Sequence, residues 1–500
     1  MSKIIYLFVA LTISPNAFAQ AYDRLWFTGY TEFPGVAGYG HAQIRFENDT
    51  VVAEPANLAF NFESTVAVMA DSAGELLFYT NGCSIANRNH EIMSNGEGLN
   101  PGEISDLVCP QKGYIVPQGA MVLPSPAGDN RYFLIHTGAM HDAVRKLRLG
   151  PLYFTEIDMN GQNGLGVVVS KNNILVAGDL GSFTAVRHGN GRDWWIIVPE
   201  FSNKTWHCFL LTPEGIESHG AQQVALTGPD CEKFMATAAS RDGDKVANWG
   251  DCKITVLDFD RCDGQLHKEL ELPAPTHWIP GGGVAFSASG RYLYATSQNV
   301  LFRADLEATD PKPKLDTMRF SYDPYLVSPY DVPGNTFHYL TTGPDGYIYG
   351  NIPSRASHLH ILKNSDVNSI ATLNFNARGL TLPVKGVRTL PHLPNYRLYD
   401  WAGSPCDTLG ISVAVNNPNQ DLCRSRIAPN PATKNSWLTI SACPDSSVAI
   451  FDVHGREKGD FYIADGAARV SLVDYAPGIY FVTIQRKTGT VTSHLLVILG

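Results

Sequence analysis

The chain has 500 residues, of which 44% are hydrophobic and 17% charged, and its formal net charge is −10. This composition excludes a disordered chain, and the length exceeds what one ordinary core organises, so two or more domains are expected. The acidic balance and the lack of a basic stripe argue against nucleic acid as a partner.

The first 19 residues are predicted to be a signal peptide. A lysine lies near the start, residues 4–13 are apolar, and Ala17 and Ala19 have the small side chains of a cleavage site. Cleavage is expected between Ala19 and Gln20. The apolar run is too short to span a bilayer, and no longer one follows, so we expect an exported chain without a transmembrane segment. A buried strand or an uncleaved anchor is the alternative.

Export places the nine cysteines in an oxidising compartment, where disulfides are the default. No Cys-x-x-Cys spacing occurs, which argues against a zinc site, and no other metal or cofactor is expected. Because nine is odd, one cysteine must stay unpaired or pair between chains. Proximity in sequence or a shared hairpin suggests three pairs: Cys83–Cys109, Cys231–Cys252 and Cys406–Cys423.

A recurring unit fills residues 22–400: an apolar strand, a turn rich in glycine and aspartate, and a strand with alternating aromatic residues. A single small sheet cannot bury both of its faces, whereas radial stacking buries them and leaves only short edges. Six copies are visible at unequal spacing. Their turn glycines are Gly74, Gly128, Gly191, Gly243, Gly290 and Gly346.

We therefore expect an all-β protein in which residues 22–400 form a six- or seven-bladed β-propeller with four-stranded blades. Six blades correspond to the six visible copies. Residues 24–29 and the stretch from about 380 to 400 would together close a seventh blade from both ends of the domain. An all-β sandwich with coincidental turns and a solenoid are the alternatives.

The end of the chain has a different pattern. Residues 427–500 contain alternating strands separated by Gly, Pro and Asp turns, enough for a small immunoglobulin-like β-sandwich. Residues 401–426 are polar and rich in Pro and Asn, which predicts a linker.

Three motifs follow one another in this tail: Pro429-Asn430-Pro431, Gly455 within "IFDVHGR", and Gly478 and Tyr480 within "GIYFV". Together they resemble the C-terminal sorting domain of type IX secretion cargo in Bacteroidetes. The resemblance implies that the type IX secretion machinery carries the folded cargo from the periplasm across the outer membrane. It also implies a protein that is secreted or held at the outer cell surface. A plain accessory domain of immunoglobulin type is the alternative.

The stretches "LLFYTNGCSIANRNHEIMSNG" and "VLDFDRCDGQL" resemble the WD-like propeller cargo proteins that commonly carry such a tail. This resemblance implies a fold and a destination but no reaction. The chain has no nucleophile elbow, no His-Glu-x-x-His helix motif and no P-loop, so no catalytic residues are predicted.

Any ligand is expected to bind in the axial channel of the propeller, where residues just before each innermost strand should point. The candidate ligand is a glycan or a protein, and the predicted function is secreted or cell-surface binding or adhesion. A propeller hydrolase or lyase acting at the channel, and a structural component of an extracellular assembly, are the alternatives. The candidate ligand-binding residues are Glu63, Gln118, Lys233 and His338.

Overall fold

The structure is a computed structural model. It describes residues 21–31, 38–47, 50–142, 146–202, 204–226, 234–250, 253–273, 282–297, 300–308, 315–319, 337–352, 356–386, 388–401, 403–409, 426–428, 432–434, 436–441, 446–453, 455–464, 467–486 and 491–499. The chain divides into two compact units, Met1–Val415 and Asn416–Gly500, and each is described by itself. Several predictions lie outside the described residues: the signal peptide 1–19 with Ala19 and Gln20, most of the linker 401–426, Lys233, Cys231, Cys252, Cys423, Pro429, Asn430 and Pro431.

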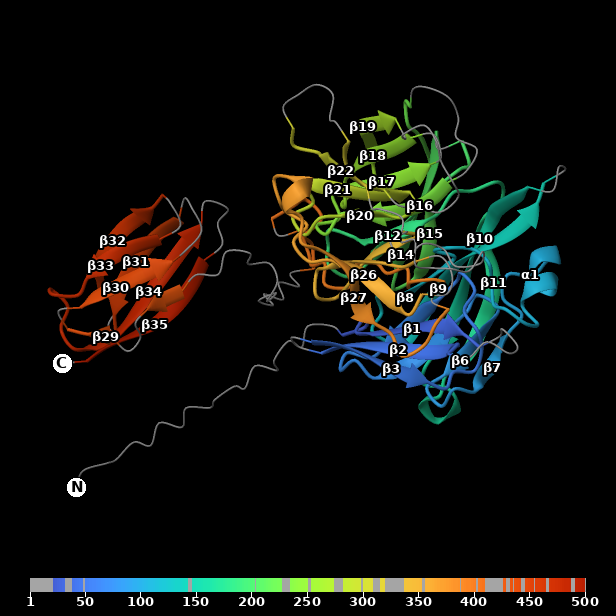
Figure 1. Ribbon diagram of the computed structural model, residues 1–500, viewed down its shortest axis with the longest axis horizontal. Helices are drawn as coiled ribbons and strands as arrows, with labels where there is room; N and C mark the ends of the chain where they lie inside the picture. Colours follow the sequence, from blue (N-terminus) through green and yellow to red (C-terminus); the bar gives the residue numbers. More distant parts are fainter. Residues whose placement is uncertain are drawn as a thin grey trace. The chain divides into compact units, whose positions relative to one another are not determined.

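The first unit is built from antiparallel sheets that follow one another in chain order (Figure 1). The first sheet has three strands, β1 (Leu25–Tyr30), β2 (Gly40–Glu47) and β3 (Thr50–Ala56). The next contains β4 (Ala67–Ala70), β5 (Leu76–Thr80), β6 (Ser84–Asn87), β7 (Ile92–Glu97), β8 (Ala120–Pro124), β9 (Arg131–His141), β10 (Leu147–Asp158) and β11 (Val167–Val176). This eight-stranded sheet consists of two four-stranded meanders, β4–β7 and β8–β11, joined by a parallel contact between β7 and β11.

Four further four-stranded sheets complete the unit. One contains β12 (Thr184–Arg187), β13 (Trp194–Pro199), β14 (Thr205–Thr212) and β15 (Gly215–Gln223). The next contains β16 (Phe234–Ala239), β17 (Lys245–Gly250), β18 (Lys253–Phe259) and β19 (Leu266–Pro273). The last two contain β20 (Val284–Phe286), β21 (Tyr292–Ser297), β22 (Val300–Asp305), β23 (Asp316–Arg319), and β24 (Leu340–Thr342), β25 (Ile348–Gly350), β26 (His358–Leu362), β27 (Phe375–Thr381). The described helices are short: α1 (Glu103–Val108), η1 (Gln162–Gly164) and η2 (Ile370–Thr372).

Burial decreases from the first strand of a sheet to its last. All residues of β12 and β13 are buried, β14 alternates, and β15 is largely exposed. The first strands of successive sheets also lie beside one another: β1 by β4, β4 by β8, and β12, β16, β20 and β24 in that order. The apolar first strands therefore face the interior of the unit, and the polar fourth strands form its outside.

Most hydrophobic clusters of this unit are shared between neighbouring sheets or meanders. The sheets of β12 and β16, of β16 and β20, and of β20 and β24 share one cluster each. The last sheet and the first also share a cluster, in which Trp26 contacts Phe46 and Tyr349. Burial against two neighbours is what a small sheet with two apolar faces requires.

The stretch from about 380 to 400 differs from the expectation. Among its described residues, β27 ends at Thr381, and one parallel bridge, between Tyr39 and Lys385, ties the stretch to the first sheet. Residues 388–401 contain no strand.

Two disulfides are present in the described part of the first unit. One joins Cys83 and Cys109, which is the pair expected from proximity. The other joins Cys262 to Cys406, so the predicted Cys406–Cys423 pair is wrong. Cys406 follows a segment that turns back into the sheets, which brings it to Cys262 in the turn after β18. Cys208 is a buried free cysteine, and burial raises the pKa of its thiol to about 12.

The second unit has two sheets that pack on a common core. The three-stranded sheet has the order β28 (Arg426–Ala428), β30 (Trp437–Ser441), β33 (Ala467–Ser471). The five-stranded sheet has the order β29 (Ala432–Thr433), β35 (Val491–Leu499), β34 (Gly478–Arg486), β31 (Ser446–Asp452), β32 (Glu457–Ile463). Their shared core includes Leu438, Ile440, Val448, Ile450 and Val482.

The described motif residues of the tail occupy turns and strand starts. Gly455 has a φ of +73° and its N–H donates to the carbonyl of Asp452, closing the turn between β31 and β32. Gly478 begins β34, and Tyr480 is buried with its hydroxyl donating to the carbonyl of Ala476. Within the part of the chain that the structure describes, no helix has the length and apolar character needed to cross a membrane.

Candidate functional site

Residues 388–401, here called the central segment, fill the place where the first strands meet. The segment bonds to residues in or next to the first strands of five sheets or meanders. The bonds are Thr28 Oγ1 to Thr389 O at 3.1 Å, Thr389 Oγ1 to Ser64 O at 2.7 Å, Thr341 Oγ1 to Pro391 O at 2.7 Å, Asn395 Nδ2 to Arg241 O at 2.7 Å, and Tyr396 OH to Val122 O at 2.6 Å. Part of the space expected to be an axial channel is thus occupied by the chain itself.

Close packing holds the central segment at its C-terminal end. A Cβ on Gly191 would lie 2.7 Å from the backbone nitrogen of Asp400, and one on Gly243 would lie 2.7 Å from a methyl carbon of Leu398. Both glycines also have positive φ. Two of the six turn glycines recognised in the sequence are therefore needed for the turn and for the approach of this segment.

Charge pairing fixes the same end of the segment. Arg397 makes a bidentate contact with Asp23, with nitrogen–oxygen distances of 2.5 and 2.6 Å. Their side chains are only 13% and 7% exposed, so the pair is largely shielded from water. A buried fork-to-carboxylate pair sets the register of the segment against the start of the first unit.

The N-terminal end of the central segment brings two of the predicted ligand-binding residues together. The guanidinium of Arg388 forms an ion pair with Glu63 and lies over the ring of Tyr30, 5.4 Å from its centroid. Burial is the main cause that lowers the pKa of His338 to about 4; a hydrogen bond to the backbone of Arg388 opposes it and the positive charge of Arg388 adds to it, so this imidazole is neutral near pH 7. Glu63, His338 and Arg388 are called the Glu63 cluster below.

The other two predicted residues do not join this cluster. The amide of Gln118 is used within the fold, because its Oε1 accepts from Thr237 N at 2.9 Å and its Nε2 donates to Thr237 O at 3.3 Å. These bonds tie the segment before β8 to β16. Lys233 lies outside the described residues.

Arg388 was missed by reasoning from the repeat pattern. It comes after the last visible copy, so no repeat position marked it. The signal available in the sequence is a cationic residue in the proline-containing stretch "RTLPHLPNYRLYDW", which has neither strand alternation nor linker polarity.

Several buried polar atoms around the Glu63 cluster have no partner. Within the described residues, Glu63 Oε2, His338 Nδ1 and Asn351 Nδ2 are buried without a hydrogen bond. Asn351 adjoins the cluster because its backbone carbonyl accepts from the N–H of His338 at 2.9 Å. Buried polar atoms are almost always bonded in folded proteins, so these three atoms mark a place where an acceptor, a donor or water is required.

The chemistry of the cluster suits hydroxyl and amide groups. A carboxylate accepts hydrogen bonds and a guanidinium donates them. A neutral imidazole donates from one ring nitrogen and accepts at the other. Within the described residues, His, Cys, Asp and Glu side chains do not gather in groups of three that could hold a metal ion. The arrangement can therefore orient a polar ligand by hydrogen bonds.

Comparison with known proteins gives one family match, which is to the secretion system C-terminal sorting domain over residues 426–498. The match assigns a type IX sorting domain to the tail, and with it export to the cell surface or secretion. No curated protein matches the chain.

Several solved structures are similar to the chain at low identity. A protein of unknown function from Desulfotomaculum acetoxidans is 13% identical, with 74% of this chain and 99% of that chain covered and a TM-score of 0.42. A putative 6-phosphogluconolactonase from Bacteroides fragilis is 13% identical, with 74% and 98% covered and a TM-score of 0.44. PorZ, a surface component of the type IX secretion system of Porphyromonas gingivalis, is 10% identical, with 92% and 68% covered and a TM-score of 0.27. Likenesses this weak establish no shared function.

Proposed function

We propose that this protein is a secreted or surface-held binding protein of a Bacteroidetes cell, in which a WD-like β-propeller is exported by an immunoglobulin-like type IX sorting domain. A signal peptide of 19 residues, cut between Ala19 and Gln20, would first take it to the periplasm. The propeller would have seven blades: the sheet β1–β3, the meanders β4–β7 and β8–β11, and four later sheets. Support for this number comes from the hydrophobic clusters shared between neighbouring sheets, including the last and the first.

The ligand that we propose for the Glu63 cluster is a glycan. One observation carries this proposal: Glu63 Oε2 and His338 Nδ1 are buried beside Arg388 with no partner among the described residues. Sugar hydroxyls both donate and accept, so neighbouring hydroxyls of one ring would satisfy a carboxylate oxygen and an imidazole nitrogen at once. A protein ligand is the outcome to consider if no glycan binds.

The test is a titration of the mature full chain against a panel of oligosaccharides, with thermal stability as the first readout. A ligand that binds only the folded state raises the unfolding temperature. For a glycan that does so, Glu63→Gln should weaken binding about tenfold or more, which corresponds to about 1.4 kcal/mol. Glu54→Gln is the matched control, because Glu54 is an exposed carboxylate on β3.

Two results would count against the proposal. Unchanged affinity in Glu63→Gln would move the glycan away from this cluster, and a panel without any stabilising glycan would favour a protein ligand. Turnover of the glycan during the titration would favour the hydrolase or lyase instead. The alternative of a structural component in an extracellular assembly gains little support from Cys208. This free cysteine is buried and therefore unsuited to cross-linking chains.

A further inference from the structure

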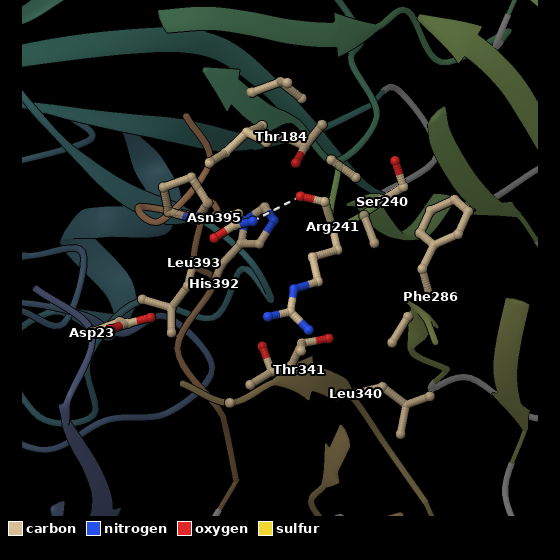
Figure 2. Close-up of a pocket in the computed structure, with 18 of the residues that line it drawn as sticks. Asp23, Thr184, Ser240, Arg241, Phe286, Leu340, Thr341, His392, Leu393 and Asn395 are labelled. Atoms are coloured by element: carbon tan, nitrogen blue, oxygen red, sulfur yellow. Dashed lines mark hydrogen bonds between the residues drawn. The ribbon is translucent and has the colours of Figure 1, made fainter. Parts of the chain in front are cut away.

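A cavity of about 120 Å³ lies beside the C-terminal half of the central segment, away from the Glu63 cluster. Residues of β12, β16, β20 and β24, with the turns that follow the last three, form one side, and residues 392–398 of the central segment form the other. Figure 2 shows Arg241, Phe286, Leu340 and Thr341 around this space, with His392, Leu393 and Asn395 on the segment. The cavity is called the Arg241 cavity below.

A tight turn places Arg241 at the cavity. The turn runs from Ser240 to Gly243, whose N–H donates to the carbonyl of Ser240 at 3.1 Å and whose φ is +73°. The Arg241 carbonyl accepts from the side chain of Asn395 at 2.7 Å, which is the dashed bond in Figure 2. With its backbone held in this way, the side chain extends into the cavity toward Thr341.

The guanidinium of Arg241 has no hydrogen bond or ion pair with any residue that the structure describes. Its surroundings also disfavour its charge: burial lowers the pKa of Arg241, and the like charge of Arg397 adds to this effect, although Asp242 and Asp366 oppose it. Desolvating a cation is costly, and no carboxylate among the described residues bonds to this guanidinium, so an anion in the cavity would stabilise it.

The neighbouring arginines, unlike Arg241, have hydrogen-bond or ion-pair partners within the chain. Arg397 is paired with Asp23, Arg187 donates to the carbonyl of Gly191 at 3.0 Å, and Arg261 donates to the carbonyl of Tyr399. Asp23 is the single acidic residue that lines the cavity, and Arg397 already uses both of its oxygens. The lining therefore offers one cation that no described residue pairs with and that an anion could bind.

We propose that the Arg241 cavity binds a small organic carboxylate. A guanidinium presents two parallel N–H groups that fit the two oxygens of a carboxylate. The lining mixes hydroxyl and amide groups with apolar side chains, and the apolar ones, among them Phe286, Leu340 and Leu393, suit a short hydrocarbon body. A volume of about 120 Å³ accommodates a short-chain acid. A free acid and the carboxyl terminus of an inserted peptide share this chemistry.

The experiment uses the mature full chain and butyrate as the probe, with isothermal titration and thermal stability as readouts. Butyrate should bind and raise the unfolding temperature, and butyramide, which has the same shape without the charge, should do neither. A short peptide with a free carboxyl terminus, compared with its amidated form, separates a peptide source from a free acid. Inorganic phosphate tests whether any anion suffices.

Three variants connect the binding to Arg241. Arg241→Gln should lose at least tenfold in affinity for butyrate, and Arg241→Lys, which keeps the charge but loses the fork, should lose part of it. Arg131→Gln is the control, since Arg131 is a half-exposed arginine at the start of β9 that pairs with Glu156 and does not line the cavity. Glu63→Gln should leave butyrate binding unchanged, so this proposal and the glycan proposal can fail separately.

The proposal is overturned if neither butyrate nor the peptide with a free carboxyl terminus binds, if butyramide stabilises the chain as much as butyrate does, or if Arg241→Gln binds as the parent does. If phosphate binds as tightly as butyrate, the site is one for anions in general, and the assignment to carboxylates is wrong. If Arg241→Gln does not fold, the affinity of Arg241→Lys for butyrate tests the proposal instead. This variant preserves the charge at the cavity and should bind butyrate more weakly than the parent does.

Discussion

Folding changes the charge state of two buried histidines among the described residues. His136 is fully buried between Asn100 and Thr155, and burial lowers its pKa to about 3. His392 is 5% exposed within the central segment, and burial lowers its pKa to about 4. Both imidazoles are therefore neutral in the folded state at pH values where the unfolded chain already binds protons.

This difference predicts that the protein loses stability in mild acid. The unfolded histidines take up protons below pH 6.5, and the folded ones do so only near pH 4 or lower, so the free energy of unfolding should fall as the pH drops from 6.5 to 4. Each histidine contributes at most about 1.4 kcal/mol per pH unit. Urea unfolding at a series of pH values measures the slope.

A single substitution separates the contribution of His392 to the loss of stability in acid from the contributions of other groups. His392→Gln keeps a donor for the carbonyl of Gln118 but cannot titrate, so it should flatten the pH dependence. His219→Gln, at an exposed position on β15, should not. A free energy of unfolding that stays constant between pH 6.5 and 4 in the parent chain would contradict the prediction.

Single residues were predictable from the sequence only where their role is local. Gly191 and Gly243 were recognised as turn residues because the turn lies within a few positions of each. Gln118 was placed among ligand-binding residues by its position before a strand, but its amide is bonded to Thr237, 119 residues away. No short pattern contains that second residue.

At the scale of elements, the central segment is the feature that organises the first unit. It has no strand of its own, and it is held by hydrogen bonds to several sheets, by the Arg397–Asp23 pair and by the Cys262–Cys406 disulfide just beyond its end. An element with few local bonds is stable only when such contacts hold it. The disulfide should therefore contribute strongly to the stability of the unit.

Loop length gives this expectation a magnitude. Cys262 and Cys406 are 144 residues apart, whereas Cys83 and Cys109 are 26 apart. In the chain-entropy description, closing the longer loop stabilises the protein by about 1.5 kcal/mol more, from 1.5RT times the logarithm of the ratio of the two loop lengths.

The measurement compares two double variants by denaturant unfolding. Cys262→Ser with Cys406→Ser should lose more stability than Cys83→Ser with Cys109→Ser, and the difference should be about 1.5 kcal/mol. Equal losses, or a larger loss for the shorter loop, would show that local strain or residual structure in the unfolded chain outweighs loop closure.

At the scale of the whole molecule, the tail sets the destination of the protein. Residues 426–498 match the secretion system C-terminal sorting domain, and the second unit has its own core of residues such as Leu438 and Val482. Because this core is separate from the clusters of the first unit, removing the tail should leave the first unit folded.

Deleting residues 427–500 should therefore trap a folded protein in the periplasm. Fractionation of the producing cells, with the two disulfides as a test of folding, measures the outcome. Normal amounts of the deleted protein outside the cell would contradict the role assigned to the tail. A substitution of the exposed Trp437 to Ser serves as a milder control, because it leaves the core of the tail intact.

The sequence by itself determined the features that are written in short stretches. Alternation within strands, glycine turns and the motifs of the tail each span fewer than about 20 residues, and they were sufficient for the all-β class, the repeated sheets and the sorting domain. These patterns are local because backbone geometry and the burial of one strand face depend on near neighbours.

Only the tertiary structure decided what fills the centre of the first unit. Cys406 is bonded to a distant cysteine, and Arg388 meets Glu63 and His338 from a distant part of the chain. The guanidinium of Arg241 lies in a cavity formed by segments far apart in the chain. Such contacts follow from the packing of sheets around the central segment. Close packing selects one arrangement among many that the same local patterns allow.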